Sequence, residues 1–223
     1  MKKIALIVAG GFGSRMKSEI PKQFMLLSGR PVLMHSISAF ISFDKNISIL
    51  LALPQNQIET WNKLCKEFSF NIEHQVVAGG ETRFNSVKNG LALITDDNAL
   101  VAIHDGVRPL VSQSTISACF ETAEKNGNAI PGIPLNDSLR QLKDNTTLAV
   151  NRDNYRLIQT PQCFFLKQLK DAYQQNYSEK FTDDASVIEM MGGEIHLVEG
   201  NRENIKITTG DDLIIAEALM KNF

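Results

Sequence analysis

A glycine-rich segment near the amino terminus carries the first chemical signal of the sequence. Residues 9–16 read Ala-Gly-Gly-Phe-Gly-Ser-Arg-Met, and Pro-Lys-Gln follows at 21–23. Glycines let a backbone turn tightly and approach an anion, so that its N–H groups bind phosphate oxygens. The charges of Arg15 and Lys22 beside such a loop suit phosphoryl transfer, in which catalysis is mainly positioning and charge stabilisation. Lys17, by contrast, is expected to belong to a solvated basic surface.

Two common nucleotide-binding motifs are each broken by one residue of this loop. A P-loop, GxxxxGK[ST], would need a glycine where Arg15 stands. The dinucleotide motif GxGxxG would need its third glycine where Met16 stands. A Rossmann dehydrogenase is therefore disfavoured.

A carboxylate follows an apolar run in the segment His-Asp-Gly-Val-Arg-Pro at 104–109. If this run is a central parallel strand, Asp105 lies at its carboxyl end, in the same crevice as the glycine loop. Mg²⁺ takes one or two carboxylates together with phosphate oxygens, so we expect Asp105 to help bind Mg²⁺. A turn or helix-cap role is the alternative for Asp105 taken alone.

Two further segments carry weaker signals. Residues 79–86, Gly-Gly-Glu-Thr-Arg-Phe-Asn-Ser, either form a plain turn with Ser86 as an N-cap or build a pocket whose backbone groups read a pyrimidine edge. Lys206 alternates with Asn204 and Thr208, which predicts that they share one face of a strand. A lysine in such a place usually protects a sheet edge, and Lys206 gains interest only beside the other motifs.

The elements that must position these residues alternate between apolar, β-rich runs and stretches of helical period. This pattern is typical of a doubly wound, mostly parallel α/β sheet with helices on both faces. The expected strands are 4–9, 47–53, 74–77, 100–104, 129–134, 156–159 and 195–198, and the expected helices are 32–43, 55–68, 86–94, 114–126, 166–177 and 211–222. No repeat or linker divides the 223 residues, so we expect a single domain over 1–223.

Between residues 135 and 152 the alternation of strands and helices is interrupted. Polar and apolar residues alternate on either side of Lys143-Asp144-Asn145-Thr146, which predicts a β-hairpin. Because such a ribbon cannot bury a face alone, it must pack on its own domain or on a partner subunit. The pattern leaves both open: a dimerisation arm or an ordinary excursion of the chain.

Composition limits the partners. A net charge of -2 argues against a nucleic-acid or membrane-surface partner, which needs a broad basic field. No run approaches the ~20 apolar residues of a membrane span. Cys65, Cys119 and Cys163 are odd in number and far apart, as expected of free thiols in a reducing cytoplasm.

Taken in order, these motifs resemble those of the 2-C-methyl-D-erythritol 4-phosphate cytidylyltransferases of the non-mevalonate isoprenoid pathway. The resemblance covers nearly the whole chain, at residues 9–16, 21–23, 79–87, 104–109, 160–162, 182–186 and 198–208. Each motif is weak alone, but the ordered set is specific. It implies transfer of CMP from CTP, with Mg²⁺, to the phosphate of 2-C-methyl-D-erythritol 4-phosphate, which yields 4-diphosphocytidyl-2-C-methyl-D-erythritol and pyrophosphate.

The resemblance also implies a role for each matching residue. Arg15 and Lys22 would hold the triphosphate and stabilise the transition state, while Arg152 and Lys206 would position the polyol phosphate. The substrate phosphate site would include Arg108, Ser138 and Thr160, and the nucleotide would contact Ala9, Gly10, Gly11, Gly13, Gly80, Glu81 and Ser86. The family is a homodimer, so the arm at 135–155 would bring Ser138 and Arg152 into the neighbouring subunit's site.

Three departures from the family pattern leave the acceptor open. The common Ala-Ala-Gly reads Ala-Gly-Gly at 9–11, His-Asp-Ala-Ala-Arg reads His-Asp-Gly-Val-Arg at 104–108, and Asp-Thr reads Asp-Ser at 137–138. The backbone chemistry and the hydroxyl are kept, so the reaction class survives. Ribitol 5-phosphate is the alternative acceptor. A non-catalytic nucleotide sensor is the alternative of another class, but a sensor has no use for residues on both the leaving and the attacking group.

Overall fold

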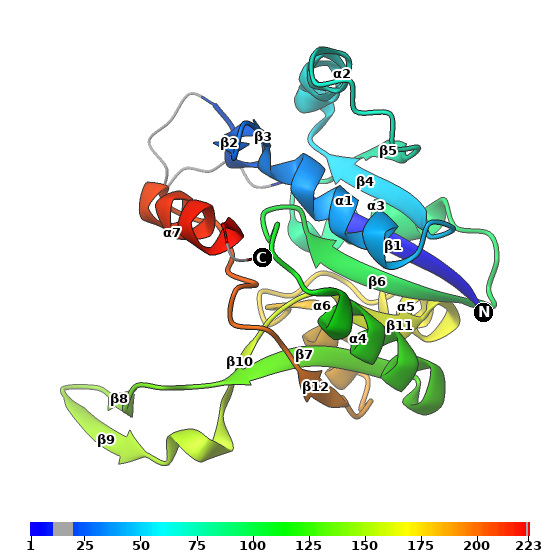
Figure 1. Cartoon of the computed structure of the whole chain (residues 1–223). Helices are drawn as coiled ribbons and strands as arrows, with labels where there is room; N and C mark the ends of the chain where they lie inside the picture. Colours follow the sequence, from blue (N-terminus) through cyan, green and yellow to red (C-terminus); the bar gives the residue numbers. More distant parts are fainter. Residues whose placement is uncertain (11–19, 222) are drawn as a thin grey trace.

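The computed structural model describes residues 1–10, 20–221 and 223 (Figure 1). In this part of the chain an eight-stranded sheet has the order β10-β7-β11-β6-β1-β4-β5, with β12 also paired to β7. The strands are β1 (Lys2–Val8), β4 (Ser48–Leu53), β5 (Gln75–Ala78), β6 (Ala99–Asp105), β7 (Asn128–Pro134), β10 (Arg156–Ile158), β11 (Gln162–Phe165) and β12 (Leu197–Glu199). Neighbours from β6 to β5 are parallel, as are β12 and β7, whereas β11 and β10 run antiparallel to their partners.

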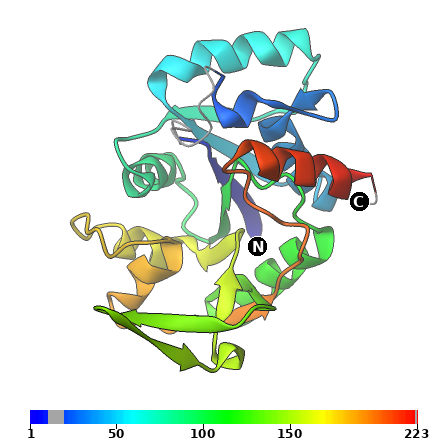
Figure 2. The same ribbon diagram turned by 90° about the vertical axis from the view of Figure 1, so that its left-hand side faces the viewer.

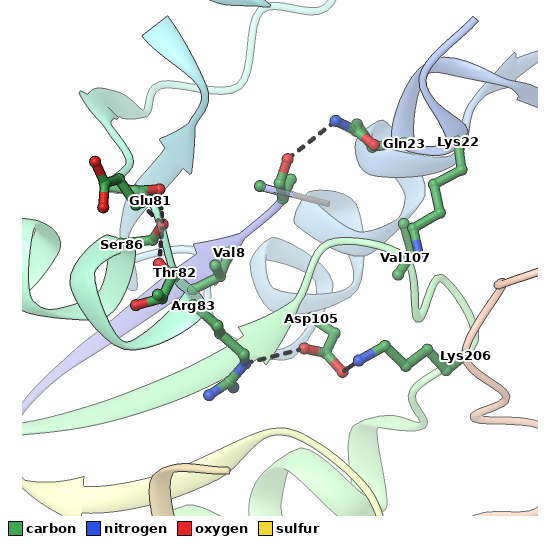
Figure 3. A pocket seen from close by; sticks show the side chains of 13 residues that line it. Val8, Lys22, Gln23, Glu81, Thr82, Arg83, Ser86, Asp105, Val107 and Lys206 are labelled. Carbon is green, nitrogen blue, oxygen red and sulfur yellow. Dashed lines mark hydrogen bonds and ion pairs between the residues drawn. The ribbon is translucent and has the colours of Figure 1, made fainter. Parts of the chain in front are cut away.

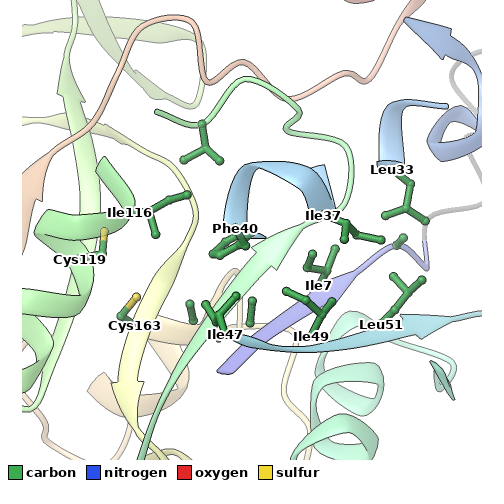
Figure 4. Close-up of a cluster of buried hydrophobic side chains, with 14 of the residues drawn as sticks. Ile7, Leu33, Ile37, Phe40, Ile47, Ile49, Leu51, Ile116, Cys119 and Cys163 are labelled. Carbon is green, nitrogen blue, oxygen red and sulfur yellow. The ribbon is translucent and has the colours of Figure 1, made fainter. Parts of the chain in front are cut away.

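Helices cover both faces of the sheet, because the central strands are apolar on both sides. Alternate residues of β1 enter different clusters: Ala5 and Ile7 pack on one face, and Ile4, Leu6 and Val8 on the other. The first face is covered by α1 (Val32–Phe43), α2 (Ile58–Glu67) and α4 (Gln113–Asn126), and the second by α3 (Arg83–Ala92), α5 (Leu166–Ala172) and α6 (Asp184–Glu189). Figure 4 shows the first cluster, with side chains of α1 over those of β1 and β4.

A smaller cluster joins the carboxyl-terminal helix α7 (Gly210–Met220) to the short hairpin of β2 (Leu26–Leu27) and β3 (Arg30–Pro31). Ser28, at the hairpin turn, donates from its N–H and its hydroxyl to the Glu217 carboxylate at 2.8 and 2.9 Å. β3 leads directly into α1, so the contact with α7 helps to hold the start of α1. Among the described residues, no helix has the length and apolar character needed to cross a membrane.

The predicted doubly wound architecture is confirmed, with one strand of the main sheet missed. The seven predicted strands all occur with small shifts of their ends, but β11 was not predicted and it separates β6 from β7. Its four residues run straight into α5, so the apolar stretch has no period that distinguishes strand from helix. Three helix predictions were wrong in extent: 55–68 begins with the 3-10 turn η3 (Gln55–Gln57), 86–94 is a helix from Arg83 to Ala92, and α5 ends at Ala172 instead of 177.

Residues 139–150 form an antiparallel hairpin of β8 (Leu139–Lys143) and β9 (Thr146–Val150). Lys143 pairs with Thr146, and Asp144 has φ +42°, which suits a two-residue turn. The hairpin extends away from the main sheet (Figure 1) and faces the viewer in Figure 2. Its side chains are mostly exposed, and Leu142 is 80% exposed. Within the described chain this ribbon therefore buries almost nothing.

Candidate active site

Two neighbouring pockets lie at the carboxyl ends of the parallel strands, where open α/β sheets bind ligands. The first pocket (Figure 3) is lined by Val8, Ala9, Gly10, Lys22, Gln23, Gly80, Glu81, Thr82, Arg83, Ser86, Asp105, Val107 and Lys206. The second pocket is lined by Arg83, Asp105, Arg108, Ile158, Gln159, Thr160, Gln162, Thr182, Asp183 and Lys206. Arg83, Asp105 and Lys206 belong to both, so they form the boundary between the two pockets.

The boundary is a single carboxylate surrounded by cations. Asp105 lies 3.5 Å from Arg83 Nε, 3.2 Å from Arg108 Nε and 3.0 Å from Lys206 Nζ. Burial alone would raise the pKa of Asp105, but the charges of Arg83, Lys206 and Arg108 outweigh it and hold that pKa well below its ordinary value. The aspartate is therefore ionised at neutral pH, and the cluster keeps an excess of positive charge that favours anions.

The tight turn after β6 holds the segment that carries Lys206 beside Asp105. Gly106 approaches β1 so closely that an added Cβ would lie 2.9 Å from both Ala9 Cβ and Leu33 Cδ1. Its N–H donates to Val8 O at 2.9 Å, and Val107 O accepts from Ile207 N, also at 2.9 Å. This last bond ties the segment around 206 to the end of β6.

The prediction that Lys206 lies on a strand was wrong. Residues 204–208 form no strand in the structure; Asn204 is fully buried, while the Lys206 side chain is 41% exposed and reaches Asp105. Asn204 points inwards because its Nδ2 donates to Thr160 O at 2.8 Å. This one buried polar side chain produces the alternation seen in the sequence.

The start of α3 forms another part of the wall of the first pocket. Thr82 is the N-cap of α3, since its hydroxyl accepts from Asn85 N at 3.1 Å, so the cap reading of Ser86 was wrong. The Ser86 hydroxyl instead accepts from Gly80 N at 3.1 Å and donates to Thr82 O at 2.9 Å. Gly80 must be glycine in this arrangement, because an added Cβ would lie 2.4 Å from Asn85 Cβ. Glu81 is exposed at the pocket's mouth.

Arg83 was not singled out from the sequence, although it stands in the predicted 79–86 segment. Its guanidinium binds Asp184 through two bonds of 2.8 and 2.6 Å, and Tyr173 donates to the same carboxylate at 2.6 Å. Asp184 is fully buried. The arginine thus links a buried carboxylate to the Asp105 cluster, and no spacing rule connects residue 83 with residue 184.

Replacing Arg83 by methionine should lower the free energy of unfolding by about 3–5 kcal/mol, because the buried Asp184 carboxylate loses its cation. Urea unfolding measures the loss. The double variant Arg83→Met, Asp184→Leu should recover most of it, since no buried charge is then left unpaired. Arg140→Met, on the exposed hairpin, serves as the control. Wild-type stability of Arg83→Met alone would contradict this account.

The family of this chain follows from comparison with known proteins. The family model for 2-C-methyl-D-erythritol 4-phosphate cytidylyltransferase matches residues 3–222. The chain belongs to this family. Cytidylyltransferases of that name from Bacteroides thetaiotaomicron and Bacteroides fragilis are 51% and 52% identical to it over 220 residues, which cover 99% of this chain and 100% of each relative.

Solved structures agree with the family. The 2-C-methyl-D-erythritol 4-phosphate cytidylyltransferase from Thermus thermophilus superposes with a TM-score of 0.80 at 30% identity, over 99% of this chain and 100% of that one. The 4-diphosphocytidyl-2C-methyl-D-erythritol synthase from Anaerococcus prevotii gives a TM-score of 0.84 at 27% identity, over 99% and 96%. The resemblance inferred from the ordered motifs is therefore confirmed.

The structure brings together only part of the predicted cytidylyltransferase site. Ala9, Gly10, Lys22, Gly80, Glu81, Ser86, Asp105 and Lys206 line the first pocket, and Arg108 and Thr160 line the second. Gly11, Gly13 and Arg15 lie outside the described residues. Ser138 and Arg152 are exposed at the base of the hairpin, where Arg152 on η4 (Arg152–Asn154) donates to Asn136 O. Within the described part of one chain, neither residue lines either pocket.

Thr160 lines the second pocket, but its hydroxyl is engaged within the protein. Oγ1 accepts from Asp105 N at 3.1 Å and lies 3.0 Å from His104 Nδ1. Burial lowers the pKa of His104 to about 4, so the ring is neutral at pH 7. Its Nε2 lies 3.0 Å from Arg108 O, which only accepts, so Nε2 carries the proton and Thr160 donates to Nδ1. Thr160 thereby holds the backbone of Asp105.

A divalent cation at this site would have to arrive with phosphates, because Asp105 already pairs with Arg83, Arg108 and Lys206. Among the described residues, no group of three His, Cys, Asp or Glu side chains is placed to hold a metal by itself. Asp105 is ionised and lies at the boundary of the two pockets, and Mg²⁺ commonly takes one or two carboxylates with phosphate oxygens and water. Asp105 is suited to supply one such oxygen.

Proposed function

We propose that this chain transfers CMP from CTP to 2-C-methyl-D-erythritol 4-phosphate, giving 4-diphosphocytidyl-2-C-methyl-D-erythritol and pyrophosphate, in the non-mevalonate isoprenoid pathway. The observation that carries the proposal is the shared cationic boundary of two pockets, formed by Arg83, Asp105 and Lys206. Such a boundary suits a reaction that joins two phosphates, one from each pocket. Membership of the cytidylyltransferase family supports the same conclusion.

The two alternatives are less well supported. Relatives with about half their residues identical are named for methylerythritol phosphate, which disfavours ribitol 5-phosphate as the acceptor. A nucleotide sensor would need only the first pocket. A sensor function does not explain the second pocket, in which Arg108 and Lys206 both pair with the Asp105 carboxylate.

In the proposed reaction, the cytosine and ribose lie along the wall formed by Gly80, Glu81 and Ser86, and the triphosphate lies against Gly10 and Lys22. The acceptor phosphate lies in the second pocket near Arg108 and Lys206. One of its oxygens attacks the α-phosphorus of CTP as the bond to the pyrophosphate group breaks in line. No general base is needed, because a phosphate oxygen is already anionic at neutral pH. Lys22 stabilises the charge that develops on the phosphoryl oxygens.

Phosphorus NMR of a reaction mixture tests this proposal directly. With CTP, Mg²⁺ and methylerythritol 4-phosphate, the phosphomonoester signal of the acceptor should disappear while signals of pyrophosphate and of a new diphosphate diester grow together. Release of inorganic phosphate without a diester would instead indicate hydrolysis, and the transfer would be wrong.

We also propose that the enzyme is a homodimer whose hairpin arm completes the neighbour's second pocket. The arm buries almost nothing in the described part of its own chain. It exposes Leu142 on β8 and Leu148 on β9, and Leu157 is exposed on the adjoining β10. Such a surface favours cover by another chain. Arg152 and Ser138 stand at the arm's base, where a partner's pocket can receive them.

Mixing two inactive variants tests this sharing of sites. Arg152→Ala and Lys206→Ala should each be inactive, yet after joint refolding they should regain about a quarter of wild-type activity, because half of the dimers are mixed and each of these has one intact site. Refolding each variant alone is the control. If Arg152 acts within its own chain, the mixture stays inactive.

Mg²⁺ as the cofactor is supported by the ionised Asp105 and by the charge of the triphosphate, which a divalent cation would neutralise in the site. We place the reaction in the cytoplasm, where CTP is available. The free thiols of Cys65, Cys119 and Cys163 are compatible with its reducing conditions.

A further inference from the structure

A fully buried glutamine holds the peptide that opens the glycine loop. Gln23 belongs to the 3-10 turn η2 (Lys22–Phe24) and lies in the wall of the first pocket. Its Nε2 donates to Ala9 O at 3.0 Å, drawn as a dashed line in Figure 3, and to Gln57 Oε1 at 2.6 Å. Because the Ala9 carbonyl only accepts, the amide of Gln23 has one possible orientation.

This orientation leaves the other end of the amide unsatisfied. Gln23 Oε1 is buried and has no hydrogen-bond partner in the part of the chain that the structure describes. An unsatisfied buried acceptor destabilises the folded state. An apolar side chain of the same length would remove that acceptor but would leave Ala9 O and Gln57 Oε1 without a donor, so the glutamine serves these two bonds and not packing alone.

The bond to Ala9 fixes the direction of the next N–H. Ala9 N donates to Ala52 O at 2.9 Å, so both polar atoms of Ala9 are held. In a planar trans peptide, the N–H of Gly10 points opposite to the carbonyl of Ala9 and therefore away from Gln23. Gly10 lines the first pocket beside Ser86, whose Oγ would lie 3.6 Å from a Cβ added to Gly10. Lys22 precedes Gln23 on the same short turn, so the two move together.

We infer that Gln23 is a positioning residue of the transfer reaction: through Ala9 it aims the Gly10 N–H, and through its turn it places Lys22, at the nucleotide phosphates. It does so without touching the substrate itself. The inference rests on the proposed function, because it assigns the first pocket to CTP.

Gln23→Met tests the inference, since methionine keeps the length of the side chain and removes its donors. We expect kcat/KM for CTP to fall by about 10- to 100-fold, while KM for methylerythritol 4-phosphate changes by less than about threefold. The urea midpoint should fall only slightly, because removal of the unsatisfied Gln23 Oε1 offsets part of the cost of leaving Ala9 O and Gln57 Oε1 without their donor. Gln57→Met is the matched control: it removes the second bond of Gln23 Nε2, keeps the bond to Ala9, and should change kcat/KM for CTP by less than about threefold.

Calorimetric titration with CTP, in the absence of the acceptor, distinguishes a failure of the Gln23 inference from a failure of the proposed function. Weaker CTP binding by Gln23→Met than by Gln57→Met supports the inference, whether or not the wild type turns over. Wild-type CTP affinity and turnover in Gln23→Met would overturn it, as would a lower urea midpoint with unchanged kinetic constants. A wild type that binds CTP and releases no pyrophosphate with any acceptor overturns the proposed function instead.

Discussion

Replacing Lys22 by alanine is expected to lower kcat by about 10²- to 10³-fold while the fold stays intact. Lys22 lines the first pocket from the turn η2, and Figure 3 shows its side chain reaching towards Val107. Removing one preorganised charge that stabilises a developing anion typically costs two to three orders of magnitude. Steady-state pyrophosphate release, with circular dichroism to check folding, measures the effect.

The matched control for this variant is Lys63→Ala. Lys63 lies on the exposed surface of α2, where it pairs with Glu59 at 2.7 Å. Its removal should leave kcat unchanged, because an exposed pair of this kind contributes little. Similar rates for Lys22→Ala and Lys63→Ala would mean that Lys22 has no part in catalysis. From the sequence, Arg15→Ala should behave like Lys22→Ala.

Asp105→Asn should have the second large effect, on both activity and stability. The neutral side chain no longer orients Arg83, Arg108 and Lys206 at the boundary of the pockets, and we expect kcat to fall by about 10²-fold. Arg108 and Lys206 lose their carboxylate, while Arg83 keeps Asp184, and the free energy of unfolding should also fall by on the order of 3 kcal/mol at pH 7.

The stability effect has a defined dependence on pH. The pKa of Asp105 is lower in the folded state than the ordinary value of about 3.9, so the aspartate stabilises the fold above that pH and loses this effect as pH falls towards the folded pKa. The difference in unfolding free energy between wild type and Asp105→Asn should therefore be constant from pH 8 to 5 and shrink below about pH 4. A difference that grows on acidification would show that the cations do not stabilise the charged form.

Much of the fold was predictable because the central strands and the main helices carry regular patterns. β1 and β6 are apolar on both faces, and α1 begins and ends at the predicted residues. The strand β11 lacked such a signal, since its apolar run passes directly into α5. The extent of a single domain over 1–223 stays a prediction.

The candidate site could be predicted from the sequence only in part. The motifs predicted 10 of the 20 residues that line the two pockets. Arg83 and Gln23 were missed as site residues, since their partners Asp184 and Ala9 are distant in sequence and only the folded chain reveals the contacts. The Lys206 segment looked like a strand because one buried polar anchor, Asn204, mimics alternation.

The central claim is tested most directly by pyrophosphate release from CTP and Mg²⁺, measured with methylerythritol 4-phosphate and ribitol 5-phosphate side by side. We expect fast release with methylerythritol 4-phosphate alone. Release only with ribitol 5-phosphate would keep the chemistry of the two pockets and contradict the acceptor, and no release with either polyol would contradict the assignment of this chain as an active cytidylyltransferase.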